Sequence, residues 1–147
     1  MAEPLVTYAL TDGVARIALN DPATLNAATE AMGGELLAAL RKARGEARAV
    51  LLTGEGRAFC SGANLVDAQN MLNDPERDGG SQLERVFNPV VLAMREMHQP
   101  VVTAVRGAVA GVGCGIALAG DLIVCSQDAY FYHAFCHVGL VPDGGAS

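Results

Sequence analysis

Residues 101–147 read VVTAVRGAVAGVGCGIALAGDLIVCSQDAYFYHAFCHVGLVPDGGAS, and this stretch decides how the rest of the chain is organised. An apolar run at 101–105 leads into a segment with four glycines between 107 and 115, and helix-forming residues follow at 116–118. This order predicts a strand that feeds a glycine-rich turn and then a helix. The first N–H groups of a helix have no acceptor within it, so an anion or a developing oxyanion is favoured there.

The composition limits the function classes. The chain has 147 residues, of which 51% are hydrophobic, and a formal net charge of −6 at pH 7. This length and composition predict one globular domain, residues 1–147. The acidic balance disfavours a nucleic-acid partner or an anionic membrane surface. Because the sequence shows neither a membrane-spanning run nor a secretory signal, we expect a cytoplasmic protein without a membrane partner.

The first third of the sequence predicts an α/β fold. Two runs of strand formers, at 5–10 and 14–19, are joined by an Asp-Gly pair, which is typical of a hairpin turn. Apolar residues at helical spacing predict a helix over 29–44 that ends at Gly45. The apolar run at 49–53 is too short for a helix and predicts a strand covered on both faces.

A second glycine-punctuated turn, residues 54–65, follows that strand. Residues 66–80 show no clear period and predict a mobile surface segment. The sequence SQLE beginning at Ser81 has the spacing of a capping box, which predicts a helix that ends before Pro100. Pro89 predicts a kink or a displaced start in this helix.

The cysteines and histidines near the end of the chain favour structural roles. The four cysteines show no C-x-x-C pair, and three lie in apolar or glycine-rich contexts, which favours reduced thiols in or near the core. His133, Cys136 and His137 lie close in sequence, but no second group of ligands accompanies them, so we expect no metal site. Tyr130 and Tyr132 alternate along a short strand and are expected to pack.

Three common kinds of glycine-turn site fit the sequence poorly. The segment GVGCG, beginning at Gly111, lacks the GxGxxG spacing of a dinucleotide-binding turn, and no GK[ST] follows as a phosphate-binding loop requires. The segment Cys60-Ser61-Gly62 lacks the first glycine of the GxSxG motif of serine hydrolases. Nucleotide binding and serine hydrolysis are therefore disfavoured.

Three segments together resemble the enoyl-CoA hydratase/isomerase, or crotonase, superfamily. They are GRAFCSGANL at 56–65, RGAVAGVGCGIALAGDLIVCSQDAYF at 106–131 and GLVPDGG at 139–145. The resemblance implies an α/β fold built as a spiral of ββα units, a site for an acyl-CoA thioester, and no cofactor beyond that substrate. Members of this superfamily continue past the equivalent of Ser147 through further helices. The resemblance therefore implies an N-terminal fragment that lacks the C-terminal helical part, from a full-length homotrimer or dimer of trimers.

The resemblance also implies an oxyanion hole made of two backbone N–H groups. By motif position these belong to Ala63, directly after Gly62, and to Val112, with Gly111 and Gly113 shaping the second turn. Negative charge develops on the thioester oxygen when the neighbouring carbon is deprotonated. Preorganised donors of this kind contribute about 10²- to 10³-fold each.

The acid–base residues implied by the resemblance favour one reaction. Hydratases of the superfamily use two glutamates, and their positions here hold Gly115 and Phe135, which transfer no proton. The resemblance instead places a catalytic aspartate at Asp143, as in epoxyphenylacetyl-CoA isomerases, Δ3,Δ2-enoyl-CoA isomerases and 4-chlorobenzoyl-CoA dehalogenases. Taken from the residues alone, Pro-Asp-Gly-Gly is ordinary turn chemistry.

We therefore expect enoyl-CoA isomerisation with Asp143 as the proton shuttle, its carboxyl pKa raised by apolar neighbours. Phe135, Val138 and Leu140 are the candidates for these neighbours and for the wall of the acyl pocket. Arg57 is an exposed candidate for the CoA phosphates. The alternatives are an enoyl-CoA hydratase, dehalogenase or hydrolase chemistry on an acyl-CoA, and a catalytically silent acyl-CoA-binding or assembly module.

Overall fold

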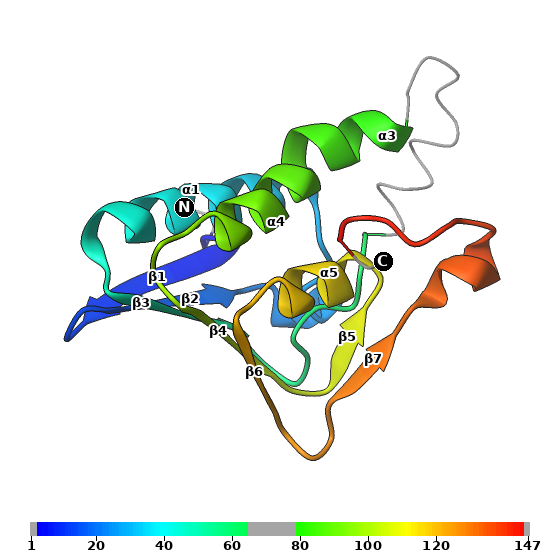
Figure 1. Ribbon diagram of the computed structural model, residues 1–147. Coiled ribbons are helices and arrows are strands. Elements are labelled where there is room, and N and C mark those ends of the chain that lie inside the picture. Colours follow the sequence, from blue (N-terminus) through cyan, green and yellow to red (C-terminus); the bar gives the residue numbers. More distant parts are fainter. Residues whose placement is uncertain (1–2, 65–78, 146–147) are drawn as a thin grey trace.

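Figure 1 shows the fold as a computed structural model, in which residues 3–64 and 79–145 are described. The strands are β1 (Val6–Thr11), β2 (Val14–Leu19), β3 (Ala49–Gly54), β4 (Val101–Val105), β5 (Ala108–Ala110), β6 (Leu122–Cys125) and β7 (Tyr130–Tyr132). The helices are α1 (Glu30–Glu46), α3 (Gly79–Gln82), α4 (Asn88–Arg95) and α5 (Val112–Leu118). Shorter or irregular helical segments are η1 (Pro22–Thr24), η2 (Leu83–Phe87) and η3 (Ala134–Val138).

The described strands form two sheets. The larger sheet has the order β1-β2-β3-β4-β6, with β1 and β2 antiparallel and the other pairs parallel, and the smaller sheet pairs β5 with β7 in parallel. From β3 onward, each strand of the larger sheet is followed along the chain by a segment that pairs within or beside the smaller sheet. The bridge between Cys60 and Val109 follows β3, β5 follows β4, and β7 follows β6. This succession is the expected spiral of ββα units.

The hairpin at the start confirms the prediction from the Asp-Gly pair. Asp12 and Gly13 both have positive φ, at 51° and 81°, as a tight turn matched to the twist of the strands requires. The register then places Val6 opposite Leu19 and Thr11 opposite Val14. A local sequence signal therefore fixed the turn and the pairing together.

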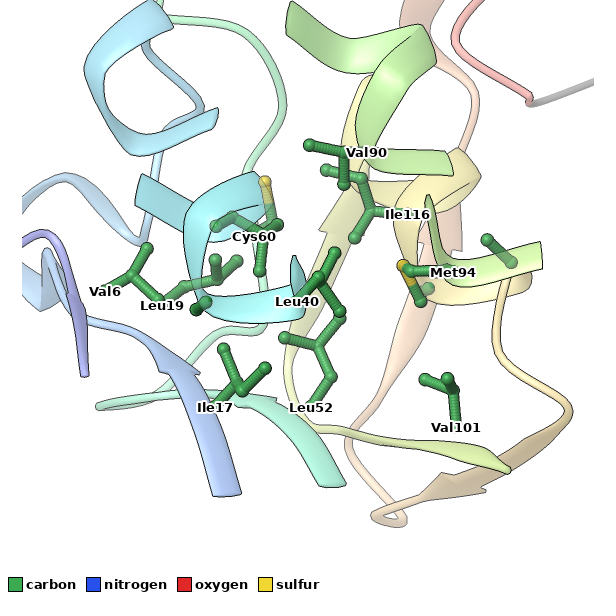
Figure 2. Close-up of a cluster of buried hydrophobic side chains, with 14 of the residues drawn as sticks. Val6, Ile17, Leu19, Leu40, Leu52, Cys60, Val90, Met94, Val101 and Ile116 are labelled. Carbon is green, nitrogen blue, oxygen red and sulfur yellow. The ribbon is translucent and has the colours of Figure 1, made fainter. Parts of the chain in front are cut away.

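The core lies between the larger sheet and the helices α1, α4 and α5 (Figure 1). Figure 2 shows side chains from both layers meeting in one cluster, which includes Val6, Ile17, Leu19, Leu40, Leu52, Cys60, Val90, Met94, Val101 and Ile116. Full burial of an aliphatic side chain contributes about 1.5–3 kcal/mol relative to exposure. The cluster therefore anchors α5, and with it the glycine-rich segment, on the sheet.

Helix α1 differs from its prediction at the C-terminal end. Thr29 caps the N-terminus by accepting from the Met32 N–H over 3.1 Å, but the helix runs through Gly45 to Glu46. The residue that follows, Ala47, is extended, with φ −98° and ψ 157°, so no left-handed residue ends the helix and glycine is not needed for that purpose. The prediction of the helix end from the position of Gly45 alone was therefore wrong.

The second long helical stretch begins earlier than predicted and changes type. Residues 66–78 of the expected surface segment lie outside the described residues, whereas Gly79 and Gly80 already belong to α3, so Ser81 lies inside the helix rather than at its cap. The π-helix η2 follows, in which the Asn88 N–H donates to Leu83 O. Pro89 has no N–H to continue a regular helix, and α4 starts in a shifted register at that point.

The last third of the described chain is more exposed than expected. Every residue of β6 and β7 is exposed, and Tyr130 and Tyr132 are 57% and 46% exposed, so the prediction that they pack is wrong for the described residues. Nothing in the described part of the chain covers this face. All four cysteines are free; Cys60 and Cys114 are buried as expected, whereas Cys125 and Cys136 are exposed. Among the described helices, none combines the length and the apolarity that crossing a bilayer requires.

Candidate active site

The first predicted donor, the N–H of Ala63, lies in an extended segment held by the loop before α1. The Ala28 N–H donates to Gly62 O over 2.7 Å, and the Asn64 N–H donates to Ala28 O over 3.0 Å. In this parallel bridge Ala63 lies between the two bonded groups, so its own N–H points to the opposite side. That N–H has no acceptor among the described residues.

Asn26 ties this loop to the segment that leads to Gly62. Its side chain is fully buried, and its Nδ2 donates to Glu55 O and to Ala58 O, each over 2.9 Å. Its Oδ1 accepts from the Asp21 N–H over 2.8 Å. Three hydrogen bonds thus satisfy the buried amide and hold both loops in one arrangement. In the sequence, Leu25-Asn26-Ala27 matches the N-terminal pattern of the enoyl-CoA hydratase/isomerase superfamily, but no role was assigned to Asn26; the polar residue between apolar Leu25 and Ala27 was the available signal.

The second predicted donor is the N–H of Val112, the first residue of α5. The residue before it, Gly111, has φ 51° and ψ −126°, a conformation that side-chain-bearing residues rarely adopt. Its N–H donates to Tyr132 O of β7 over 3.1 Å, which fixes the start of the helix against the smaller sheet. The Val112 N–H itself has no acceptor within the described chain.

The two glycine turns touch each other through their backbones. A Cβ on Gly62, where φ is 100°, would lie 3.2 Å from Ala110 O, and a Cβ on Gly111 would lie 3.6 Å from the Gly62 Cα. Ala63 and Val112 each follow directly after these touching residues. The structure therefore brings both predicted donor segments into one place, although they are separated by nearly fifty residues of sequence.

Two further glycines let α5 pack closely on other segments. A Cβ on Gly113 would lie 2.8 Å from the Cβ of Cys60, in the strand-like segment before Gly62. A Cβ on Gly115 would collide with the carbonyl oxygen of Gly144, in the turn that carries Asp143. The sequence predicted a turn-forming role for these glycines, and that prediction is wrong for Gly113 and Gly115, which lie inside α5. Their close approaches were not predicted, because the partners are distant in sequence.

Asp143 lies on a turn seated between α5 and α4. In Figure 1 the chain runs back from η3, drawn in orange, to this position beside α5, drawn in yellow. Gly144 and Gly145 have φ values of 55° and 83°. A Cβ on Gly144 would lie 3.0 Å from Val112 Cγ2, and one on Gly145 would lie 3.2 Å from Val91 Cγ1. The carboxyl group is half-buried, and burial raises its pKa above the ordinary value.

The three residues predicted as apolar neighbours of Asp143 differ in burial. Phe135 is buried, with 8% of its surface exposed, but Leu140 is 60% exposed and offers no closed wall. Val138 belongs to η3, and its side chain lies outside the described part of the structure. The apolar groups that meet the turn of Asp143 come instead from α5 and α4, as the Val112 and Val91 contacts show.

The histidines of this region face aromatic rings. The rings of His133 and Phe135 lie 6.2 Å apart between centroids, and those of Tyr132 and His137 lie 5.8 Å apart. Within the described ranges, no three His, Cys, Asp or Glu side chains are grouped so as to hold a metal ion. Arg57, the candidate for the CoA phosphates, is exposed.

Two surface hollows in the described residues lie away from these groups. One, of about 280 Å³, lies between α1 and α4 beside Leu37 and Leu92, and the other, of about 270 Å³, lies along β4 and β6 beside Ala104 and Val124. Neither is lined by Ala63, Val112 or Asp143.

Comparison with known proteins gives this arrangement a family context. A family model described as "Enoyl-CoA hydratase/isomerase" matches residues 9–147. The chain is 43% identical over 148 aligned residues to a protein of Rhodobacter capsulatus named "Probable enoyl-CoA hydratase", which covers 100% of this chain and 56% of that relative. It is 37% identical over 137 residues to the 1,2-epoxyphenylacetyl-CoA isomerase of Escherichia coli, covering 92% of this chain and 52% of that relative.

Solved structures agree with the sequence comparison. The chain superposes on the crystal structure of an enoyl-CoA hydratase from Polaromonas sp. JS666 with a TM-score of 0.89 and 32% sequence identity, covering 95% of this chain and 55% of that one. The chain therefore spans about half the length of the relatives that it matches. The expected crotonase fold is confirmed, and the chain belongs to the enoyl-CoA hydratase/isomerase family.

Proposed function

We propose that the full-length protein isomerises an enoyl-CoA thioester, with Asp143 as the proton shuttle and the N–H groups of Ala63 and Val112 as the oxyanion hole. The observation that carries this proposal is the half-buried carboxyl of Asp143, whose pKa is raised by burial, on a turn packed against Val112. Positions 115 and 135 hold glycine and phenylalanine, so neither offers a second titratable group.

The reaction needs one base that works in both directions. The Asp143 carboxylate accepts a proton from C2 of a 3-enoyl thioester, and the electron pair of the broken C–H bond moves toward the thioester oxygen. The two N–H groups stabilise the negative charge on that oxygen. Asp143 then returns the proton to C4 as the electrons shift back, and the double bond moves to C2–C3. A carboxyl with a raised pKa is a stronger base than an ordinary one and suits this task.

The 1,2-epoxyphenylacetyl-CoA isomerase among the relatives supports this reading, while the relative named as a hydratase keeps hydration as the alternative. The proposal includes a CoA thioester as substrate, no further cofactor, a cytoplasmic location, and a homotrimer or dimer of trimers as the full-length assembly. In such an assembly, residues beyond the described chain would complete the acyl pocket.

The test uses full-length protein, a 3-enoyl-CoA and a 2-enoyl-CoA, with ultraviolet absorbance and mass spectrometry of the products. Isomerisation creates a conjugated thioester at constant mass, whereas hydration adds one water. We expect conversion of the 3-enoyl substrate at constant mass, and a loss on the order of 10²- to 10⁴-fold in kcat for Asp143→Ala. Asp128→Asn, which alters an exposed carboxylate in the loop between β6 and β7, should leave the rate unchanged.

Two results would contradict the proposal. Addition of water by both the wild type and Asp143→Ala would mean that the catalytic carboxylates lie elsewhere. Binding of CoA thioesters without any turnover would favour the silent binding module.

A further inference from the structure

Gly115 lies in the interior of α5, where a glycine is unfavourable by itself. Glycine destabilises a helix interior relative to alanine because its backbone loses more freedom on folding. Gly34 in α1 shows that this chain does place glycines where they touch nothing, since a Cβ there would meet no atom within 4 Å. Gly115, in contrast, has main-chain atoms of another segment where its Cβ would lie, which explains why position 115 holds a glycine.

The space beside Gly115 is filled by the backbone of the turn that carries Asp143. A Cβ at Gly115 would collide with Gly144 O, lie 2.8 Å from Gly144 C and lie 3.3 Å from Gly145 C. These atoms belong to the main chain, so no change of side-chain conformation can relieve the collision. In this structure a side chain at position 115 is incompatible with the observed position of the turn at residues 143–145, called the seated turn below.

The seated turn reaches its place through contacts on three elements. Besides Gly115, Gly144 faces Val112 of α5 and Leu83 of η2, with a Cβ at Gly144 lying 3.9 Å from Leu83 Cδ2. Gly145 faces Val91 of α4. These facing residues are apolar, and α5 itself carries no charged residue. The charged residues of the other two elements are exposed: Glu84 and Arg85 of η2, and Arg95 of α4, with Arg85 paired to Glu30 and Arg95 to Asp121. Burial is what raises the carboxyl pKa of Asp143.

We infer that Gly115 is a positioning residue for Asp143: the bare backbone at 115 admits the turn against α5 and thereby sets the turn that carries the Asp143 carboxyl beside Val112. Residue 115 then selects which proton-transfer group the site can hold, because any side chain there displaces the turn. This inference rests on the proposed function, since it concerns the group that moves the proton.

The test is Gly115→Ala in the full-length protein, with Gly34→Ala as the matched control. Both changes add one methyl group to a helix interior. We expect Gly115→Ala to lower kcat on the order of 10²-fold, because the base is displaced, while KM stays within about twofold. The ascending limb of the pH profile should also move to lower pH, because a turn released into water loses the burial that raises the Asp143 pKa. Gly34→Ala should leave kcat, KM and the pH profile unchanged.

A wild-type rate and pH profile for Gly115→Ala would overturn the inference. Should that variant fail to fold by circular dichroism, Gly145→Ala lifts the same turn from the side of α4, and its normal kcat would overturn the inference equally. The proposed function fails in a different way: the wild type does not isomerise, or Asp143→Ala stays active. In that case a carbon-13 titration of the Asp143 carboxyl tests the inference about Gly115 separately from the reaction. An unchanged Asp143 pKa in Gly115→Ala would show that residue 115 does not position the turn.

Discussion

The surroundings of Asp143 disfavour the ionised form of its carboxyl group. Its carboxyl is half-buried, and desolvation is the cause of its raised pKa. A group with a folded-state pKa above its unfolded value binds its proton more tightly in the folded state. Its contribution to stability is therefore complete below the ordinary carboxyl pKa of 3.8 and is lost as the pH rises through the raised value. At neutral pH the ionised carboxylate destabilises the fold.

Asp143→Asn should accordingly stabilise the protein in a pH-dependent way. The amide keeps the shape of the carboxyl and carries no charge, so the variant avoids the desolvation penalty. We expect its gain in the free energy of unfolding to be near zero around pH 4, to grow as the pH rises through the raised pKa, and to be constant above it. Urea unfolding of both proteins across this range measures the difference. A gain that does not vary with pH would assign the effect to packing and not to titration.

Helix α5 illustrates at the scale of one element why its sequence was difficult to interpret. Taken by themselves, the four glycines between 107 and 115 favoured a turn with a helix after it, whereas the motif position placed Val112 at the start of the helix. The helix α5 does begin at Val112, and it includes Gly113 and Gly115. Helix propensity argues against these glycines, but close contact with Cys60 and Gly144 excludes any larger residue. Tertiary packing thus overrides local preference, and a single sequence does not reveal the partners.

Gly113→Ala and Gly34→Ala should change stability in opposite directions. At Gly113 the added methyl group would lie 2.8–2.9 Å from the Cβ, O and Sγ atoms of Cys60, so we expect a loss of about 1–3 kcal/mol from overpacking. At Gly34 the methyl group meets open space, and the helix should gain about 0.5–1 kcal/mol. Urea denaturation with a shared m-value gives both numbers. Equal signs for the two variants would mean that α5 does not press on Cys60.

Local signals predicted some elements well, and long-range contacts explain the rest. The Asp-Gly turn between β1 and β2 and the 3.6-residue spacing of α1 are encoded within a few residues. The donors at Ala63 and Val112 were placed by motif, and the structure brings their segments together. By contrast, β5 spans three residues and exists because it pairs with β7, and the role of Asn26 depends on acceptors about thirty residues away. Neither is visible in a local pattern.

In the part of the molecule that the structure describes, helices cover one side of the larger sheet, and the last strands are left exposed. Helices α1 and α4 cover a face of the larger sheet, whereas β6 and β7 lie away from them (Figure 1). Large apolar side chains are exposed on these strands and after η3: Leu122, Val124, Tyr130, Leu140 and Val141 are each at least 57% exposed. Soluble monomers rarely expose a contiguous apolar patch of more than a few hundred Å². We therefore expect this face to associate with other surfaces.

The 147-residue chain on its own should consequently self-associate, and lysines on β6 and β7 should reduce that association. Val124→Lys combined with Tyr130→Lys places two charges on the exposed strands, where they oppose pairing with a further copy. We expect light scattering to show a smaller average mass for this double variant, together with weaker binding of a hydrophobic dye. Leu92→Lys, at a residue of α4 that is 54% exposed, is the control and should change neither quantity. An isolated chain that is monomeric before any substitution, or an equal response to Leu92→Lys, would show that association does not depend on the β6 and β7 face.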